Sequence, residues 1–377
     1  MGRRIEVPIT PSVLKWAIAE SGYTEPEVSS WIEGGEATLT SWFNETAKPS
    51  LSEMKTIAGK LHRQLATFLL PVAPVSAAVP VKFRHPLGGH QRPLNPIERR
   101  FVRRARRLQE AHVWLLGELA QPTPDIPRVS LSASSDDAAR SMRSLLGISL
   151  AQQFEWRSAS AAFDAWREAI ERLGIIVVLF PMGNVSCRGF SIWSDAAPLI
   201  AVNTAWKDEA RIFTLFHELG HLVTRTDSAC ATGDAATGGP DEPAERWSET
   251  FAAAIVIPHE SVGRLPGVTD LRQLGRLANQ YKVSLRAMAI RLIGAGKANW
   301  GLYRSIPSTA DNKPKGGPVG AGRNRRAIRE DEFGHRGTSV FVEAVRREVI
   351  TPSQALDYLD IPVAEFAQLE PVEFPSR

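Results

Sequence analysis

Two histidines and a glutamate stand at a spacing that can hold a metal ion and activate water. His217, Glu218 and His221 lie within the stretch 212–223, which reads IFTLFHELGHLV. Residues four apart share one face of a helix, so both imidazoles can face one cation. Glu218 is rotated by about 100° from His217, which places its carboxylate beside the ion as a proton acceptor. The spacing therefore predicts a catalytic zinc site with Glu218 as the base.

The setting of this motif argues against a chance match. A random His-Glu-x-x-His is expected in on the order of one chain in a hundred. Here, the flanking side chains are Ile, Phe, Leu and Val on nearly all sides of the helix, and such a helix is buried. Buried polar groups cost free energy unless they are bonded. The three polar side chains therefore need a shared partner, and a metal ion provides one.

A catalytic zinc ion needs a third protein ligand and one open position. The extended pattern HExxHxxGxxH would place a glycine at position 224 and a histidine at position 227. The chain has Thr224 and Asp227 there. A carboxylate can bind zinc, so Asp227 stays an alternative ligand, but the glycine that would turn it back to the metal is missing.

The next predicted helix, residues 242–257, offers two further carboxylates. Glu245 and Glu249 are one turn apart and point the same way. The run 251–257 is wholly apolar, which indicates that this helix is buried as well. We expect Glu245 to bind the metal, with Glu249 as the alternative ligand or as the group that orients a histidine.

The elements around the motif predict a mainly α protein with a small sheet, of the α+β class. Aliphatic and β-branched runs indicate strands, and apolar residues at helical spacing indicate helices. The predicted helices are 161–173, 208–224, 242–257, 271–281, 284–293, 339–349 and 352–359, and the predicted strands are 175–180, 188–193 and 198–203.

The first seventy residues predict short helices with tight turns, which resemble a helix-turn-helix module. They cover residues 11–20, 25–33, 38–44 and 50–61, the last with Ser50 as a good N-cap. A linker rich in Pro and Ala follows at 71–80, and Asn95-Pro96 then opens a helix that continues to about Leu119. We divide the chain into residues 1–75, 76–134 (linker and basic helix), 135–300 (metal site) and 301–377 (basic linker and last helices).

Charge is distributed in segments. The net charge is only +4, yet residues 16–47 hold six glutamates and no Lys or Arg, which disfavours phosphate binding by the helix-turn-helix module. The candidate nucleic-acid contacts are Arg99, Arg100, Arg103, Arg104 and Arg107. The alternative to nucleic-acid contact by these arginines is a solvated helix face. The basic stretch 313–329 could also contact nucleic acid, and its alternative is a disordered linker.

The composition argues against a membrane protein, a secreted protein and a cysteine-rich zinc module. The longest apolar runs are too short to span a bilayer, and no apolar segment follows the N-terminal arginines. Two cysteines, Cys187 and Cys230, make no zinc module. We expect a cytoplasmic protein with no membrane partner.

The motif blocks resemble those of the ImmA/IrrE metallopeptidases. FTLFHELGHL at 213–222 is similar to the signature FTLAHELGHL of that family. The strand residues Gly189-Phe190 and 198–203, and the block from Glu245 to Pro258, are similar as well. The family usually has Ala-Asn where this chain has Ser248-Glu249. Residues 10–71 resemble the XRE-type helix-turn-helix domain that is fused to some of these peptidases.

The resemblance implies a zincin-like fold, Glu245 as the third ligand, and cleavage of helix-turn-helix repressors that control stress or mobile-element genes. Zinc is the expected cofactor, although these ligands accept manganese. Tyr281, His259 and Arg291 are candidates for a second oxyanion donor. The N-terminal module would bind DNA, a repressor or another copy of the chain. Two alternatives stay open: a DNA-binding regulator whose peptidase-like domain only senses a signal, and a structural zinc domain.

Overall fold

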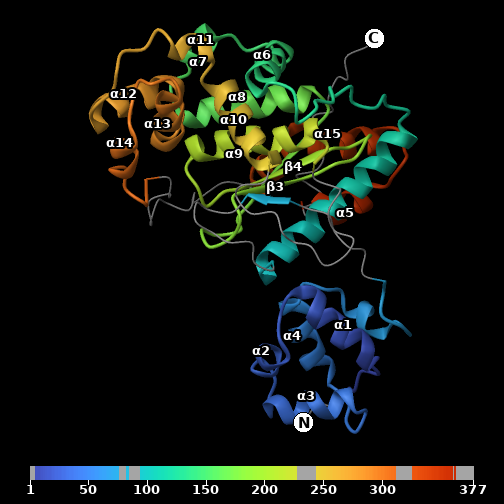
Figure 1. Ribbon diagram of the computed structural model, residues 1–377. Coiled ribbons are helices and arrows are strands. Elements are labelled where there is room, and N and C mark those ends of the chain that lie inside the picture. Colours follow the sequence, from blue (N-terminus) through green and yellow to red (C-terminus); the bar gives the residue numbers. More distant parts are fainter. Residues whose placement is uncertain are drawn as a thin grey trace. The chain divides into compact units, whose positions relative to one another are not determined.

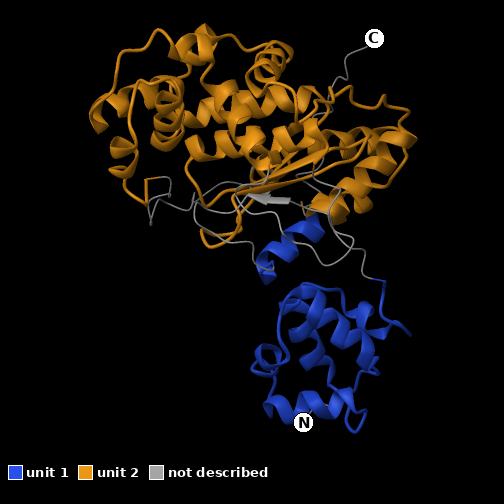
Figure 2. Ribbon diagram, in the orientation of Figure 1, with its two compact units in different colours: residues 1–79, 92–104 blue, residues 80–91, 105–377 orange. Residues whose placement is uncertain are grey.

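The computed structural model describes residues 5–75, 82–84, 94–226, 243–310, 325–359 and 361, with side chains except at 82–84 and 325–327 (Figure 1). The chain divides into two compact units: unit 1 is residues 1–79 with 92–104, and unit 2 is residues 80–91 with 105–377 (Figure 2). This grouping differs from the four segments expected from the sequence. The long basic helix contributes to both units, and the C-terminal helices belong to the same unit as the metal motif.

Unit 1 is built from short helices around one apolar core. They are α1 (Pro11–Ser21), α2 (Glu25–Ser29), α3 (Gly35–Phe43) and α4 (Leu51–Lys60), followed by a 3-10 turn, η1 (Leu65–Leu69). Ser50 caps α4 as predicted, and its hydroxyl accepts from the Glu53 backbone N–H at 3.3 Å. The second helix ends at Ser29, earlier than expected, and Gly34 and Gly35, with φ of 80° and 59°, turn the chain at the start of α3. The core includes Trp42, which is 1% exposed.

The sheet of unit 2 has the strand order β1-β3-β4-β2. The strands are β1 (Lys82–Arg84), β2 (Ile176–Phe180), β3 (Gly189–Ile192) and β4 (Leu199–Asn203). Strand β2 runs parallel to β4, whereas β3 is antiparallel to β4 and β1 is antiparallel to β3. The three strands predicted from the sequence are confirmed, and β1 is an addition that the sequence did not suggest.

Helices surround this sheet, so the α+β class predicted from the sequence is confirmed. They are α5 (Pro96–Glu118), α6 (Ser135–Leu146), α7 (Leu150–Glu155), α8 (Ala159–Arg172), α9 (Asp208–Thr224), α10 (Pro243–Val256), α11 (His259–Val262), α12 (Leu271–Tyr281), α13 (Leu285–Gly294), α14 (Trp300–Arg304), α15 (Arg325–Arg346) and α16 (Pro352–Leu359). Helix α9 packs against β3 and β4 and also against α8 and α10, while α15 packs against β2 (Figure 1). Among the described helices, none is long and apolar enough to cross a membrane.

Helix α15 is longer than the predicted 339–349. Its course contains Gly334, whose φ of 74° and ψ of 169° are not helical. A Cβ at this position would lie 1.9 Å from Glu171 Oε1, so only glycine fits the close approach to α8. The break interrupts the helical periodicity, which explains why the sequence predicted only the second part of this helix.

Candidate metal centre

Helix α9 carries the two histidines in the centre of the core of unit 2. Leu215, Phe216 and Leu219 on the same helix are fully buried, and the Phe216 ring meets the edge of Trp166 with centroids 4.9 Å apart. These apolar contacts fix the helix in place and in rotation. His217 and His221 are each 1% exposed, so their imidazoles face an interior region rather than bulk water.

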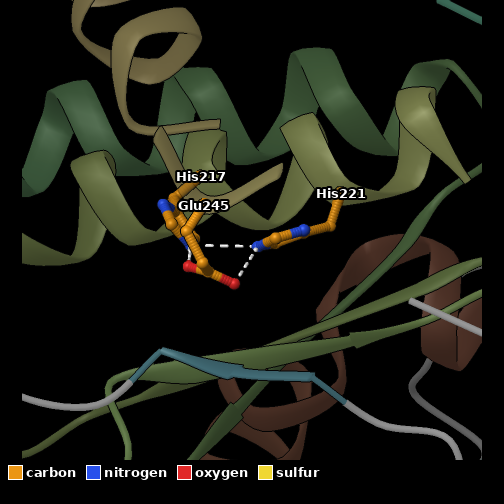
Figure 3. Close-up of side chains that lie close together, drawn as sticks. All are labelled: His217, His221 and Glu245. Atoms are coloured by element: carbon orange, nitrogen blue, oxygen red, sulfur yellow. Dashed lines mark hydrogen bonds and ion pairs between the residues drawn. The ribbon is translucent and has the colours of Figure 1, made fainter. Parts of the chain in front are cut away.

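Three donor atoms converge between α9 and α10 (Figure 3). The Nε2 atoms of His217 and His221 are 3.1 Å apart. The Nε2 atom of His217 lies 3.2 Å from Oε2 of Glu245, and that of His221 lies 3.2 Å from Oε1. Donors around a tetrahedral zinc ion with bonds of about 2.0–2.1 Å are roughly 3.3 Å apart. The spacing of these three residues therefore fits a single ion of that size.

Glu245 comes from the first turn of α10, and a close helix contact places it. A Cβ on Gly220 of α9 would meet Ser248 Cβ and Oγ at 3.0 Å, so glycine there lets α10 approach. Ser248 is fully buried against it. The side chain of Glu245 keeps 24% of its surface exposed. The ligand group is therefore reachable by water and substrate from one side.

Electrostatics favour an ionised carboxylate at Glu245. Burial by itself raises the pKa of Glu245, but hydrogen bonds and charge interactions with His217 and His221 outweigh it, so the pKa lies well below its usual range. An ionised carboxylate is the form that binds a cation.

The carboxylate of Glu218 lies against the sheet. Ser191 of β3 donates its hydroxyl hydrogen to Glu218 Oε2 at 3.0 Å, and Glu218 is fully buried. A Cβ on Gly189 would meet Thr214 Cγ2 at 2.6 Å and the Ala201 carbonyl oxygen at 2.7 Å. Glycine at this position lets β3 pass close under α9, and this approach brings Ser191 to the predicted base.

His221 is oriented by a residue that the sequence analysis did not single out. Its Nδ1 lies 3.0 Å from Thr226 Oγ1, which leaves Nε2 to face the other donors. Thr226 returns to the helix because Arg225 adopts φ 56° and ψ 38°, the left-handed conformation usual at a helix C-terminus. The turn is made by Arg225, whereas the glycine of the extended pattern would stand at position 224.

A cavity of about 380 Å³ begins one helical turn from the metal ligands. Phe213 lines it and precedes His217 by four residues, and Glu249 lines it and follows Glu245 by four. One turn is about 5.4 Å along a helix. The cavity therefore lies beside the ligand group along these two helices, and none of the three ligands lines it.

The structure separates the other predicted site residues. Glu249 lines the cavity but is not part of the group of three donors. His259 and Arg291 also line the cavity, and Arg291 forms an ion pair with Asp136. Tyr281 is buried with its ring edge-on to Phe154, 4.9 Å between centroids, and does not line this cavity. Asp227 lies outside the described residues. Whether Tyr281, His259 or Arg291 acts on an oxyanion stays a prediction.

The arginines of α5 do not form one uniform set. Arg103 donates to the carbonyl oxygens of Glu20 and Leu61 at 3.2 and 3.3 Å, and burial, followed by the charge of Arg63, lowers the pKa of Arg103 to about 10. Two others lie over aromatic rings, Arg100 over Phe101 and Arg107 over Tyr358. Arg99 donates from Nε to the Leu94 carbonyl oxygen at 3.2 Å. Nucleic-acid contact by these residues and Arg104 stays a prediction.

Comparison with known proteins agrees with this site. Residues 170–292 match the model of the Peptidase_M78 family, described as the IrrE N-terminal-like domain. The matched segment includes strands β2 to β4 and helices α9 and α10, and hence every residue of the ligand group. This match supports a zincin-like, metallopeptidase-type domain. No curated protein and no solved structure matched the chain significantly.

Proposed function

We propose that this protein is a zinc-dependent endopeptidase that cleaves a helix-turn-helix repressor or an antitoxin-like partner. The observation that carries the proposal is the convergence of His217, His221 and Glu245, whose nitrogen and oxygen atoms approach one another to 3.1–3.2 Å, with Glu218 directly after His217 on α9. A purely structural zinc site has no use for that carboxylate, because such sites use four protein ligands and no base.

Each residue of the site has a separate role in the proposed reaction. His217, His221 and Glu245 would hold the ion, which when bound supplies Lewis acidity and a more acidic water. Glu218 accepts a proton from the attacking water and returns it to the leaving amine. Ser191 holds one oxygen of Glu218 in place at 3.0 Å. Thr226 sets the ring of His221 through Nδ1, in the manner of the outer partners that orient metal-bound histidines.

The repressor substrate is proposed from the resemblance of the motif blocks and is supported by the match over residues 170–292. Unit 1 would recognise it. Helix α3, where a DNA reader would place its base contacts, reads GEATLTSWF and holds an acidic residue and no cation. We therefore assign unit 1 to docking of a protein partner, because DNA binding depends on cations that meet phosphates.

A co-expression assay tests the enzyme claim. The protein is produced together with helix-turn-helix repressors encoded beside it, in three forms: wild type, Glu218→Gln and Glu168→Gln. Glu168 is an exposed partner of Arg172 on α8, so its substitution controls for loss of a charge. We expect fragments of one repressor with the wild type and with Glu168→Gln, and an intact repressor with Glu218→Gln.

Metal analysis of the same three proteins completes the test. About one zinc ion per chain is expected in each, since Glu218 is not one of the ligands. Bound metal together with an intact repressor in all three strains would contradict the proposed peptidase activity.

A mobility-shift assay over a range of salt concentrations distinguishes the peptidase from the alternative, a DNA-binding regulator. A salt-dependent shift that disappears when residues 1–75 are removed would favour that alternative. A shift that persists after this truncation would assign binding to the arginines of α5 instead.

A further inference from the structure

Strand β3 has a neighbour on each of its edges. On one side it pairs with β4, and on the other with β1, a strand of three residues. In the β1–β3 pair Lys82 stands opposite Ser191, Phe83 opposite Phe190, and Arg84 opposite Gly189. The pairing is antiparallel, and the chain supplies the outer strand from a segment far upstream in the sequence.

Two of these positions of β3, Gly189 and Ser191, face the proposed base. Ser191 donates to the Glu218 carboxylate, and the space at Gly189 is bounded by Thr214 and by Glu218 Cγ, the latter at 3.5 Å. Helix α9 packs against β3, and Figure 3 shows strands of the sheet passing beneath the ligand side chains. Strand β3 is therefore the strand that contacts the proposed base, and the edge that it turns away from β4 is the edge that β1 covers.

A peptide bond is cut only when its chain is extended enough to enter the site. An exposed strand edge binds such a chain through main-chain hydrogen bonds, in the way that peptides add to sheets. One edge can pair with one strand at a time. In the described residues the edge of β3 is already taken, because β1 satisfies it.

We propose that β1 is an internal competitor that occupies the β3 edge on which an extended peptide substrate pairs, so that substrate binding requires β1 to leave. The inference rests on the proposed function and adds its regulation. The pairing is short enough to open: β1 offers three residue pairs, whereas β3 and β4 share four and β2 and β4 share five. An isolated pairing of such short strands is marginal by itself.

The first test measures binding without turnover. The probe is a fluorescein-labelled peptide with the sequence PVKFRHPLG of residues 80–88, and all proteins carry Glu218→Gln so that the probe stays intact.

Arg84→Pro removes a backbone N–H that faces β3 and fixes its φ, which opposes strand pairing. The Asn203 N–H donates to the Arg188 carbonyl oxygen, so in this register Phe190 turns its main-chain groups to β4, whereas Gly189, opposite Arg84, turns its own to β1. Arg84→Thr is the matched control, because it also removes the charge and keeps both the N–H and a residue that favours strands.

We expect the zinc-loaded protein with Arg84→Pro to bind the probe with a dissociation constant about tenfold or more below that of the parent. This corresponds to an edge that is open in roughly one parent molecule in ten. The protein with Arg84→Thr should bind as the parent does. Equal affinity of all three proteins for the probe would overturn the proposal.

A second measurement covers the case in which the protein with Arg84→Pro does not fold. Hydrogen–deuterium exchange is followed in the Glu218→Gln protein, with Arg84 intact, on peptides that span residues 80–86 and 188–193, with and without saturating probe. Competition predicts that the probe makes the amides of β1 exchange faster while those of β3 stay protected. Binding of the probe with β1 still protected would contradict it.

The outcomes for this inference and for the enzyme are separate. If the protein cleaves no repressor but the probe displaces β1, the competition by β1 stands and the proposed substrate is refuted. If the protein cleaves its repressor equally well with and without Arg84→Pro, while β1 of the unsubstituted chain stays protected, the peptidase activity stands and the competition by β1 is refuted.

Discussion

Two helices of this protein, α9 and α5, carry polar side chains at regular spacing, but only those of α9 converge on one site. In α9 the two histidines turn toward the same point, where Glu245 joins them at 3.2 Å. In α5 the arginines disperse: Arg103 holds the ends of two helices of unit 1, while Arg100 and Arg107 lie over aromatic rings.

The difference lies in what covers each helix. Helix α9 is enclosed, so its polar groups must satisfy one another or share a ligand. The α5 arginines lie half-buried or at the surface, where each finds a separate partner. Spacing alone establishes which side chains share a face, whereas burial decides whether they act together. The experiments below test this contrast, starting from the largest expected effect.

Loss of one imidazole should abolish the site. His221→Ala removes a ligand whose Nε2 lies 3.1 Å from that of His217. We expect the zinc content to fall from about one ion per chain to near none and peptide cleavage to drop by about 10³-fold or more, because the ion contributes several kcal/mol. Atomic emission and a cleavage assay measure the two quantities. The control is His62→Asn in unit 1, which is exposed and should leave both unchanged.

Removal of the metal should destabilise unit 2 and leave unit 1 unaffected. Saturation at about 1,000 times the dissociation constant adds about 4 kcal/mol to the unit that binds the ion. We expect calorimetry with and without a chelator to shift only the transition of unit 2. His221→Ala should be insensitive to the chelator, and an equal shift of both transitions would show that the ion is not confined to α9 and α10.

In α5, one arginine should matter to unit 1 far more than its neighbour. Arg103→Ala removes two charged hydrogen bonds to main-chain carbonyl groups, and bonds of this kind contribute about 1.5–3 kcal/mol. We expect the free energy of unfolding of unit 1 to fall by about that amount in urea titrations. Arg100→Ala, which removes only a contact over Phe101, should change it by about 0.5 kcal/mol or less. Equal effects would mean that the arginines act as one set after all.

Thr226→Val should weaken metal binding without removing a ligand. The side chain keeps its shape and loses the oxygen that lies 3.0 Å from His221 Nδ1. Partners of this kind change metal affinity by about 10–100-fold. A competition titration with a chromophoric chelator gives the zinc dissociation constant. An unchanged constant would show that the apolar packing of α9 alone orients His221.

Much of the fold around the site could be predicted because its signals are local. The apolar residues at helical spacing defined α9 at 208–224, as observed. The β-branched run defined β2 to within one residue. Strand β1 was missed because three residues carry no period, and its pairing partner lies far away in the sequence. The short helices α6, α7 and α14 were likewise not singled out.

The ligands were more predictable than the residues that orient them. Spacing and the family resemblance favoured Glu245 over Glu249, and the structure brings Glu245 to the histidines. Ser191 and Thr226 could not be chosen in this way, because a single hydroxyl in a strand or after a helix has no distinctive pattern. Their roles depend on Gly189 and Arg225, whose backbone positions arise only when the sheet and α9 pack together.

The turn at Arg225 couples the metal site to the rest of unit 2. Its guanidinium lies 3.3 Å from the centre of the Trp193 ring and donates to the Ile126 carbonyl oxygen at 3.0 Å. A glycine would adopt this backbone conformation more easily but would leave the turn unanchored. The orientation of His221 thus depends, through Thr226 and Arg225, on the position of the Trp193 ring. We expect a substitution at Trp193 to weaken metal binding at this site.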